Sequence, residues 1–149
     1  MGRWKSEIRF RVSAFLPEHL DMILPVGKLI GEIPREDLLR CYLRGPAYTA
    51  WVDGRILCIG GVTILWPGTG EAWAIFAQGF DKHSVFIHRQ TVKHLQEITE
   101  KHSLRRIQAC TLKEDRRANH WLDHLGFVQE GEMPEYRNGK TFIRWAKCG

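Results

Sequence analysis

The stretch ANHWLDHLGF, residues 118–127, decides the fold. Gly126 follows its apolar residues at the point where a helix commonly ends on a left-handed residue. We therefore predict an amphipathic helix over Glu114–Leu125 that leads directly into a strand. Four apolar residues share one face of this helix at i, i+3, i+4 and i+7 spacing: Ala118, Trp121, Leu122 and Leu125.

The sequence on both sides predicts more elements of regular structure. Residues 105–112 read as a strand, and residues 127–147 read as two strands around the turn Asn138-Gly139. Further upstream, residues 80–102 predict the first long helix. The apolar residues that indicate it lie three apart: Val92, Leu95 and Ile98.

The N-terminal half predicts a strand, two helices and three consecutive strands. Residues 7–15 alternate apolar and charged residues, as a half-buried strand does. One helix lies between Pro17 and Pro25 with Leu20, Ile23 and Leu24 on it, and a second begins near Pro34. The three strands are 47–53, 55–66 and 72–78, with turns at Asp53-Gly54 and at 66–71.

Length and composition fit one globular domain over residues 1–149. The chain is 44% hydrophobic and 26% charged, as in ordinary folded proteins. Its longest nearly apolar run, residues 56–66, is about half of what a membrane helix needs. The N-terminal residues MGRWKSEIRFRV do not match a secretory signal, and the four cysteines form no CxxC pair. We expect a cytoplasmic protein with reduced thiols and no membrane association.

This order of elements, together with Ala118, Leu125, Gly126 and Phe127, resembles the GNAT superfamily of N-acetyltransferases. The resemblance implies an α/β (α+β) fold with a central mixed, mostly antiparallel sheet. It also implies that the fourth and fifth strands splay apart and that about four helices flank the sheet. The implied reaction transfers an acetyl group from acetyl-CoA to an amine of an unknown acceptor.

A narrower resemblance is to phage GNAT-like proteins related to internal virion protein A of short-tailed phages. It rests on a Trp on the fourth strand, here Trp73, after a Gly-rich hairpin that contains Gly68 and Gly70. It implies a bacteriophage protein located in the host cytoplasm or the virion. A GNAT fold without catalysis, serving as a virion component or a host-interaction protein, is the corresponding alternative function.

The GNAT resemblance implies two contacts to coenzyme A. The backbone of Ile75, Phe76 and Ala77 would pair with the pantetheine arm. A loop followed by a helix N-terminus would bind the pyrophosphate, since unpaired amides there favour an anion. The corresponding loop contains Gly79 but no second glycine. Four side chains could replace the missing amides by charge, or form only a solvated face: Lys82, His83, His88 and Arg89. Ser84, beside them, is a further candidate contact to the cofactor.

The catalytic positions also differ from the GNAT pattern. The Asn at the start of the last helix and the Tyr near its end correspond here to Asp115 and Leu122, and Leu122 cannot donate a proton. We take Tyr136 as the candidate general acid, with Cys110 as a possible substitute. Glu71, at the start of the fourth strand, is the candidate general base, and its competing interpretation is a solvated carboxylate.

The sequence raises two further kinds of site. His120 and His124 share a helix face at i, i+4 spacing, but no third ligand is evident and we predict no metal site. Residues 101–149 hold ten Lys and Arg against six Asp and Glu, a net charge of +4. That excess, with Trp4 and Trp145 as stacking groups, is the basis of a nucleic-acid-binding hypothesis, which ranks third because no known motif supports it.

A protein partner or a homodimer is a further hypothesis. Six tryptophans in 149 residues exceed what a core of this size ordinarily uses, and aromatic residues are enriched at the centres of interfaces.

Overall fold

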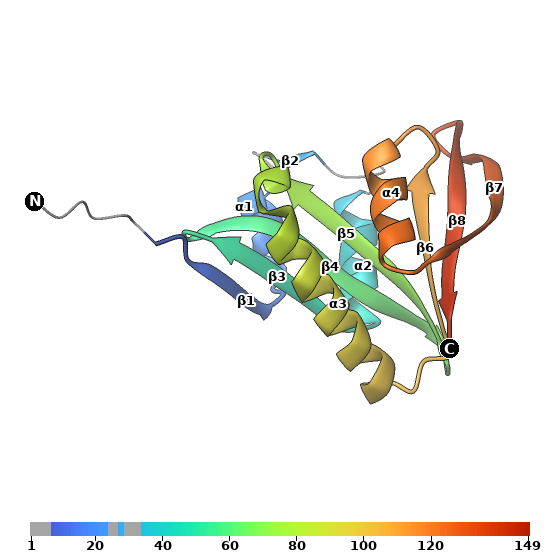
Figure 1. Cartoon of the computed structure of the whole chain (residues 1–149), viewed down its shortest axis with the longest axis horizontal. Helices are drawn as coiled ribbons and strands as arrows, with labels where there is room; N and C mark the ends of the chain where they lie inside the picture. The colour runs from blue at the N-terminus through green and yellow to red at the C-terminus, as the bar shows by residue number, and fades with distance from the viewer. Residues whose placement is uncertain (1–6, 24–26, 29–33) are drawn as a thin grey trace, which may run out of the picture.

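A computed structural model describes residues 7–23, 27–28 and 34–149. The described strands form one eight-stranded sheet in the order β1-β3-β4-β5-β6-β8-β7, with β2 paired to β5 outside this path (Figure 1). All pairings are antiparallel except that of β5 with β6. Four α-helices accompany the sheet in the described ranges.

The N-terminal elements follow the predicted order. The two-residue strand β2 is an addition that the sequence pattern does not predict, so the predicted fourth and fifth strands are β5 and β6. Leu24, expected on the first helix, lies outside the described residues. The elements are β1 (Phe10–Ala14), α1 (His19–Ile23), β2 (Gly27–Lys28), α2 (Arg35–Leu43), β3 (Ala47–Val52), β4 (Arg55–Trp66) and β5 (Thr69–Ala77).

The C-terminal elements also match the prediction, with one change at the start of the long helix. Residues 80–83 form a 3-10 turn, and the α-helix proper begins at Ser84. Val92 is 45% exposed, because the buried stripe of this helix runs instead through Ile87 and Ile98. The elements are η2 (Phe80–His83), α3 (Ser84–Lys101), β6 (Arg106–Leu112), α4 (Arg116–His124), β7 (Val128–Arg137) and β8 (Lys140–Cys148).

Strands β5 and β6 lie side by side over a short distance and then separate. Their parallel pairing covers three residues of each strand, Thr69–Glu71 with Arg106–Gln108. Figure 1 shows the two strands starting together near the C terminus and diverging toward the end where β2 and α4 lie. Strand β5 begins three residues earlier than predicted, and these three residues are the ones that pair with β6. The expected fold class, including the splayed pair, is confirmed.

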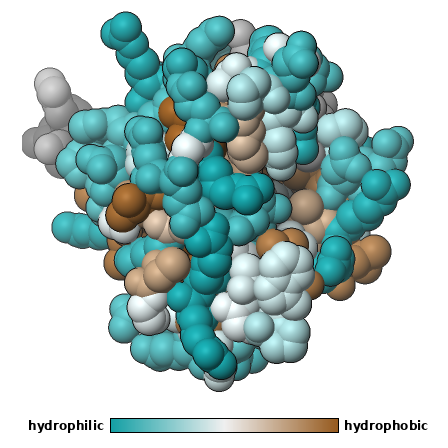
Figure 2. Space-filling model, turned by 90° about the vertical axis from the view of Figure 1, so that its right-hand side faces the viewer, coloured by the Kyte–Doolittle hydropathy of each residue, from teal (hydrophilic) through white to brown (hydrophobic). Residues whose placement is uncertain are grey.

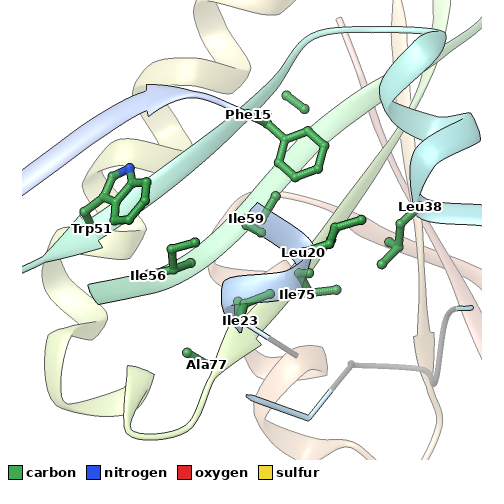
Figure 3. Close-up of a cluster of buried hydrophobic side chains, with 10 residues drawn as sticks. Phe15, Leu20, Ile23, Leu38, Trp51, Ile56, Ile59, Ile75 and Ala77 are labelled. Atoms are coloured by element: carbon green, nitrogen blue, oxygen red, sulfur yellow. The ribbon is translucent and has the colours of Figure 1, made fainter. Parts of the chain in front are cut away.

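Each face of the sheet is covered by a pair of helices. On one face, α1 and α2 bury Leu20, Ile23 and Leu38 against residues of β3, β4 and β5, including Ile59 and Ile75 (Figure 3). On the other face, α3 and α4 bury a second cluster on β6 and β8. Side chains of β5 alternate between these faces, so Glu71, Trp73 and Ile75 face α1 and α2.

The predicted turns are present and have the backbone geometry that their residues favour. Asp53 and Gly54 have φ values of 48° and 79°, as a two-residue hairpin turn requires. Asn138 and Gly139 repeat this geometry between β7 and β8. Gly126 follows α4 with φ of 89°, in the left-handed conformation that a helix C-terminus commonly uses.

The outer side of the C-terminal hairpin has no large hydrophobic area. Figure 2 shows this side of the molecule as mainly hydrophilic, with hydrophobic residues in small separate patches. Every helix of the described ranges is too short or too polar to span a bilayer.

Candidate functional site

A cleft of about 1590 Å³ opens where β5 and β6 separate. Glu71 and Cys110 line it from the face that carries α1 and α2, whereas Phe76 and Trp121 line it from the face that carries α3 and α4. Side chains from both faces reach one cleft because the backbones of the two strands no longer pair. The cleft therefore passes through the sheet.

At the narrow end of the cleft, Glu71 meets two side chains of β6. Its Oε1 atom accepts a hydrogen bond from Gln108 Nε2 at 3.4 Å and lies 3.8 Å from Cys110 Sγ, which can donate to it. The last paired residues of the two strands are Glu71 and Gln108, so Cys110 lies just beyond the point where pairing stops. A carboxylate and a thiol thus share the start of the cleft.

Tyr136 of β7 joins this cluster, although it is 65 residues from Glu71 in sequence. Its hydroxyl interacts with Cys110, and it lines the same cleft. Burial, followed by the negative charges of Cys110 and Glu71, raises the pKa of Tyr136 above its ordinary value. The structure therefore brings together the two residues that the sequence suggested as base and acid.

Cys110 lies at the centre of the cluster. Burial first, and the Glu71 carboxylate second, raise the pKa of the Cys110 thiol, while Tyr136 and Arg144 partly oppose this shift. Arg144 follows on the neighbouring strand, directly paired with Cys110, and its Nε atom is buried with no partner among the described residues. At neutral pH the thiol keeps its proton, and Glu71 is placed to receive it.

The outer edge of β5 is partly open toward the cleft. Among the described residues, no strand pairs with Ala72–Ile75 on the side opposite β4. Phe76 and Ala77, in contrast, pair with Lys28 and Gly27 of β2. Of the three residues predicted to pair with the pantetheine arm, Ile75 lies on the open part of the edge, and the other two are already next to a protein strand.

The loop after β5 leads to an uncapped helix N-terminus. Gly79 has φ of 84°, and no side chain caps the first turn of α3, which contains no acidic residue. An uncapped helix N-terminus is the kind of backbone where the resemblance implies an anion-binding loop. Gly79 supplies the left-handed residue of this turn, and η2 connects it to α3 in place of the second glycine.

The predicted phosphate-binding side chains separate into two groups. Ser84 and Arg89 line the cleft. Lys82 is exposed and His83 packs edge-on against the ring of Phe10, with ring centroids 5.4 Å apart, and neither is among the lining residues. The 3-10 turn explains this division, because it rotates residues 82 and 83 away from the side on which Ser84 faces the cleft.

Arg117 of α4, one of the ten basic residues in the C-terminal third of the chain, is a cation that lines the cleft. Its guanidinium carbon lies 5.4 Å from the centre of the Phe80 ring, so it reaches from α4 to the loop before α3. The sequence places Arg117 38 residues after Gly79, and only the packing of α4 beside α3 brings the two regions together. An amphipathic pattern on α4 does not reveal which cation of its polar face meets the loop.

Three other residues at or near α4 help to hold the helix in place. Asp115 accepts a hydrogen bond from Ala118 N at 3.0 Å and so caps the helix. Leu122 is buried in the core between α4 and the sheet. Trp121 packs against Phe76 and donates from Nε1 to His88 Nδ1 at 3.2 Å, which links α4 to α3 across the cleft.

The histidine pair and the basic residues have simple environments. His120 and His124 are exposed, with their Nε2 atoms 2.9 Å apart. Over the described residues, no group of three or more potential ligands surrounds a common point. Lys113 forms an ion pair with Glu132 and Arg106 forms one with Glu130, so part of the basic excess is neutralised locally.

The prediction that Trp145 stacks on nucleic-acid bases is wrong, because this side chain is buried. Its side chain is 2% exposed and its Nε1 donates to Thr111 Oγ1 at 2.9 Å. The alternation of β8 puts it under α4, on the buried face. Trp4 lies outside the described residues.

Comparisons with known proteins agree on the architecture. No model of a known protein family matches the sequence, and no curated protein matches it. Many solved structures are similar. An IAA acetyltransferase from Bacillus cereus superposes with a TM-score of 0.75 at 14% identity, covering 95% of this chain and 100% of that one.

Of two further similar structures, one is named as a member of the GNAT family and the other contains CoA. An acetyltransferase of the GNAT family from Streptococcus pneumoniae has a TM-score of 0.72 at 13% identity, over 94% of this chain and 99% of that one. A Bacillus subtilis acetyltransferase in complex with CoA has a TM-score of 0.71 at 14% identity, over 95% and 99%. At these identities the likeness shows the fold, and the chain has the GNAT fold.

Proposed function

We propose that this protein transfers the acetyl group of acetyl-CoA to an amine of an acceptor molecule. The observation that carries the proposal is the cleft between β5 and β6, which has a carboxylate, a thiol and a phenol at its narrow end. The CoA complex of a protein with the same fold supports the choice of donor.

The cleft has suitable groups for a donor with phosphates and an extended amide-containing arm. The uncapped N-terminus of α3, with Ser84, Arg89 and Arg117, would hold the phosphates. The open edge of β5 at Ala72–Ile75 would pair with the amides of the arm. When bound, the donor supplies an activated thioester, so the protein needs mainly to position it and move protons.

The polar cluster supplies the proton transfers. An amine must lose a proton to form an amide, and Glu71 is the carboxylate at the narrow end of the cleft that can accept it, directly or through water. Tyr136 has a raised pKa, which keeps its hydroxyl protonated and able to donate to a departing thiolate. Glu71 and Tyr136 are thus the proposed base and acid.

The test is a calorimetric titration with acetyl-CoA of the wild type and of three single variants. Arg117→Ala and Arg89→Ala each remove a cation that lines the cleft, so each should weaken binding by about tenfold, as expected for a lost charge-assisted contact. Lys82→Ala is the matched control, since Lys82 lies in the same region but outside the lining residues, and its affinity should stay near that of the wild type. Absence of binding to the wild type, by heat and by thermal stabilisation, would refute the proposal.

The same titration decides between this proposal and the non-catalytic alternative. A GNAT fold that serves as a virion component or host-interaction protein, alone or as a homodimer, has no need of a phosphate grip, and its cleft would not bind the donor. The phage resemblance and the protein partner stay hypotheses. Retention on DNA that falls steeply with salt would favour the nucleic-acid hypothesis instead.

A further inference from the structure

We propose that Cys110 carries the acetyl group as a thioester between donor and acceptor, because its thiol lies 3.8 Å from the Glu71 carboxylate at the narrow end of the cleft. This inference rests on the proposed function and adds a covalent step to it. A nucleophile within reach of a base, with a third group that orients the base, is the arrangement that covalent catalysis requires. Here Gln108 Nε2 donates to the same Glu71 oxygen at 3.4 Å.

The position of Cys110 follows from strand register. Glu71 and Gln108 are the last residues that β5 and β6 pair, and Cys110 is two residues further on the same face of β6. Beyond this point β5 no longer covers that edge of β6. The thiol therefore borders the cleft while the backbone of Cys110 stays paired with Arg144 of β8, which holds its position.

The hydrogen bond between Cys110 and Glu71 runs from the thiol to the carboxylate. Sγ donates toward Glu71 Oε1 at 3.8 Å, and an interaction with Tyr136 lowers the pKa of the thiol. The thiol proton thus already points at the group that would remove it. Because burial raises the pKa of this thiol, Sγ becomes nucleophilic only as Glu71 takes the proton, which restricts its reactivity to an acyl carbon held in the cleft.

The other cysteines lack this arrangement. Burial raises the pKa of Cys58 to about 12, and its thiol packs against the α3 side of the sheet. Cys148 is exposed at the end of β8. Cys41 of α2 also lines the cleft, but within the described part of the chain its thiol contacts no carboxylate. Cys41 is therefore the matched control for Cys110.

The proposed step balances in both halves. Sγ of Cys110 forms a bond to the acyl carbon as its proton passes to Glu71, and the bond from that carbon to the donor sulfur breaks. The departing thiolate takes the proton of Tyr136, which the proton held by Glu71 then replaces. In the second half, the acceptor nitrogen forms a bond to the same carbon and gives its proton to Glu71. The bond to Sγ then breaks, and Sγ takes that proton back, with Tyr136 stabilising it by hydrogen bonding. One thioester and one amine become one amide and one thiol.

The experiment is mass spectrometry of the protein after incubation with acetyl-CoA and no acceptor, quenched in acid. The wild type should gain the mass of one acetyl group, located on Cys110 by peptide mapping and removed by hydroxylamine, which cleaves thioesters and leaves acetyl-lysine intact. Cys41→Ser should gain the same adduct, and Cys110→Ser should not gain a hydroxylamine-labile one. Glu71→Gln should form the adduct at least tenfold more slowly.

Calorimetry with acetyl-CoA on the same samples separates the two claims, and circular dichroism checks that each variant is folded. Donor binding without any labile adduct, in the wild type and after rapid quenching, would overturn the role of Cys110 and leave direct transfer from donor to amine. An adduct on Cys41 or on lysines alone would also overturn it. Absence of donor binding would overturn both this inference and the proposed function.

Discussion

His19 of α1 is a buried histidine whose hydrogen bonds fix its protonation state. Its Nδ1 accepts from the backbone N–H of Leu16 at 3.1 Å and lies 2.8 Å from the hydroxyl of Thr49 on β3. An atom that accepts from an N–H has no proton of its own, so the ring is neutral. Burial accordingly lowers the pKa of His19 below 6.5.

This protonation state predicts part of the pH dependence of stability. As pH falls below 6.5, the ordinary His value, the unfolded chain binds a proton at His19 while the folded chain does not, so the free energy of unfolding decreases. His19→Asn keeps an acceptor near Nδ1 and removes the titration. Urea unfolding at a series of pH values should show a shallower decline for the variant below pH 6.5. Parallel curves for both proteins would mean that His19 is protonated in the folded state.

Residue-scale chemistry also shows where sequence reasoning reaches its limit. Glu71 and Tyr136 could be chosen from the sequence because few residues of the right type occur near the expected strands. Their meeting at Cys110 could not be foreseen, since it depends on the register of β5 with β6 and on the path of β7. Glu71 is also not simply surrounded by solvent, because it contacts Gln108 and Cys110.

At the scale of elements, the two glycines of β4 permit a close crossing of the chain. A Cβ atom on Gly61 would lie 2.5 Å from the carbonyl oxygen of Pro46 and 2.9 Å from Ala47 Cα, both backbone atoms at the start of β3. A Cβ on Gly60 would lie 3.2 Å from the Trp73 carbonyl oxygen, a tighter contact than usual but one that a small shift relieves.

We therefore predict that a glycine-to-alanine substitution destabilises the protein more at Gly61 than at Gly60. Gly61→Ala should lower the free energy of unfolding by about 1–3 kcal/mol, because backbone has to move to make room. Gly60→Ala serves as the control. It should lower the free energy of unfolding by less, because its nearest contact of 3.2 Å needs only a small shift. In both variants alanine also restricts the unfolded chain, which offsets part of the loss. Chemical denaturation of the two variants measures the difference, and equal stability of both would contradict the close approach at Pro46.

Short strands and helix ends were the elements that the sequence predicted least well. Strand β2 has two residues, too few for any periodic pattern to indicate. Residues 69–71 of β5 pair with β4 on one side and with β6 on the other, whereas the local sequence PGTGE is typical of a turn. In both cases pairing with other strands accompanies a conformation that the local sequence does not indicate.

At the scale of the molecule, few contacts across the sheet connect its two halves at the cleft. Three residue pairs join β5 to β6, and α3 and α4 meet across the cleft through Trp121 and His88. A ligand that fills the cleft would contact β5 on one side and β6 and α4 on the other. Binding should therefore stabilise both halves together.

Hydrogen exchange measured by mass spectrometry tests this coupling. Saturating CoA should slow exchange at residues 72–75 of β5 and in β6 and α4 at the same time, because each of these borders the cleft. Residues 76 and 77, already paired with β2, should change less. Protection confined to the outer surface of α4 would indicate binding elsewhere.

The sequence by itself determined the element order, the hairpin turns and the apolar faces of the helices. These follow from local physics: the period of the apolar residues, Asn-Gly and Asp-Gly at turns, and Gly126 after α4. The ANHWLDHLGF stretch indicated the fold because helix, cap and strand start are all encoded within ten consecutive residues.

Only the tertiary structure decided the content of the cleft. In the folded chain Glu71, Cys110 and Tyr136 lie together. Arg117 lines the cleft and Lys82 does not, and Trp145 is buried under α4. Each outcome depends on strand register or helix packing between residues far apart in sequence. Such contacts are set by the free energy of packing the whole chain, and no local pattern contains them.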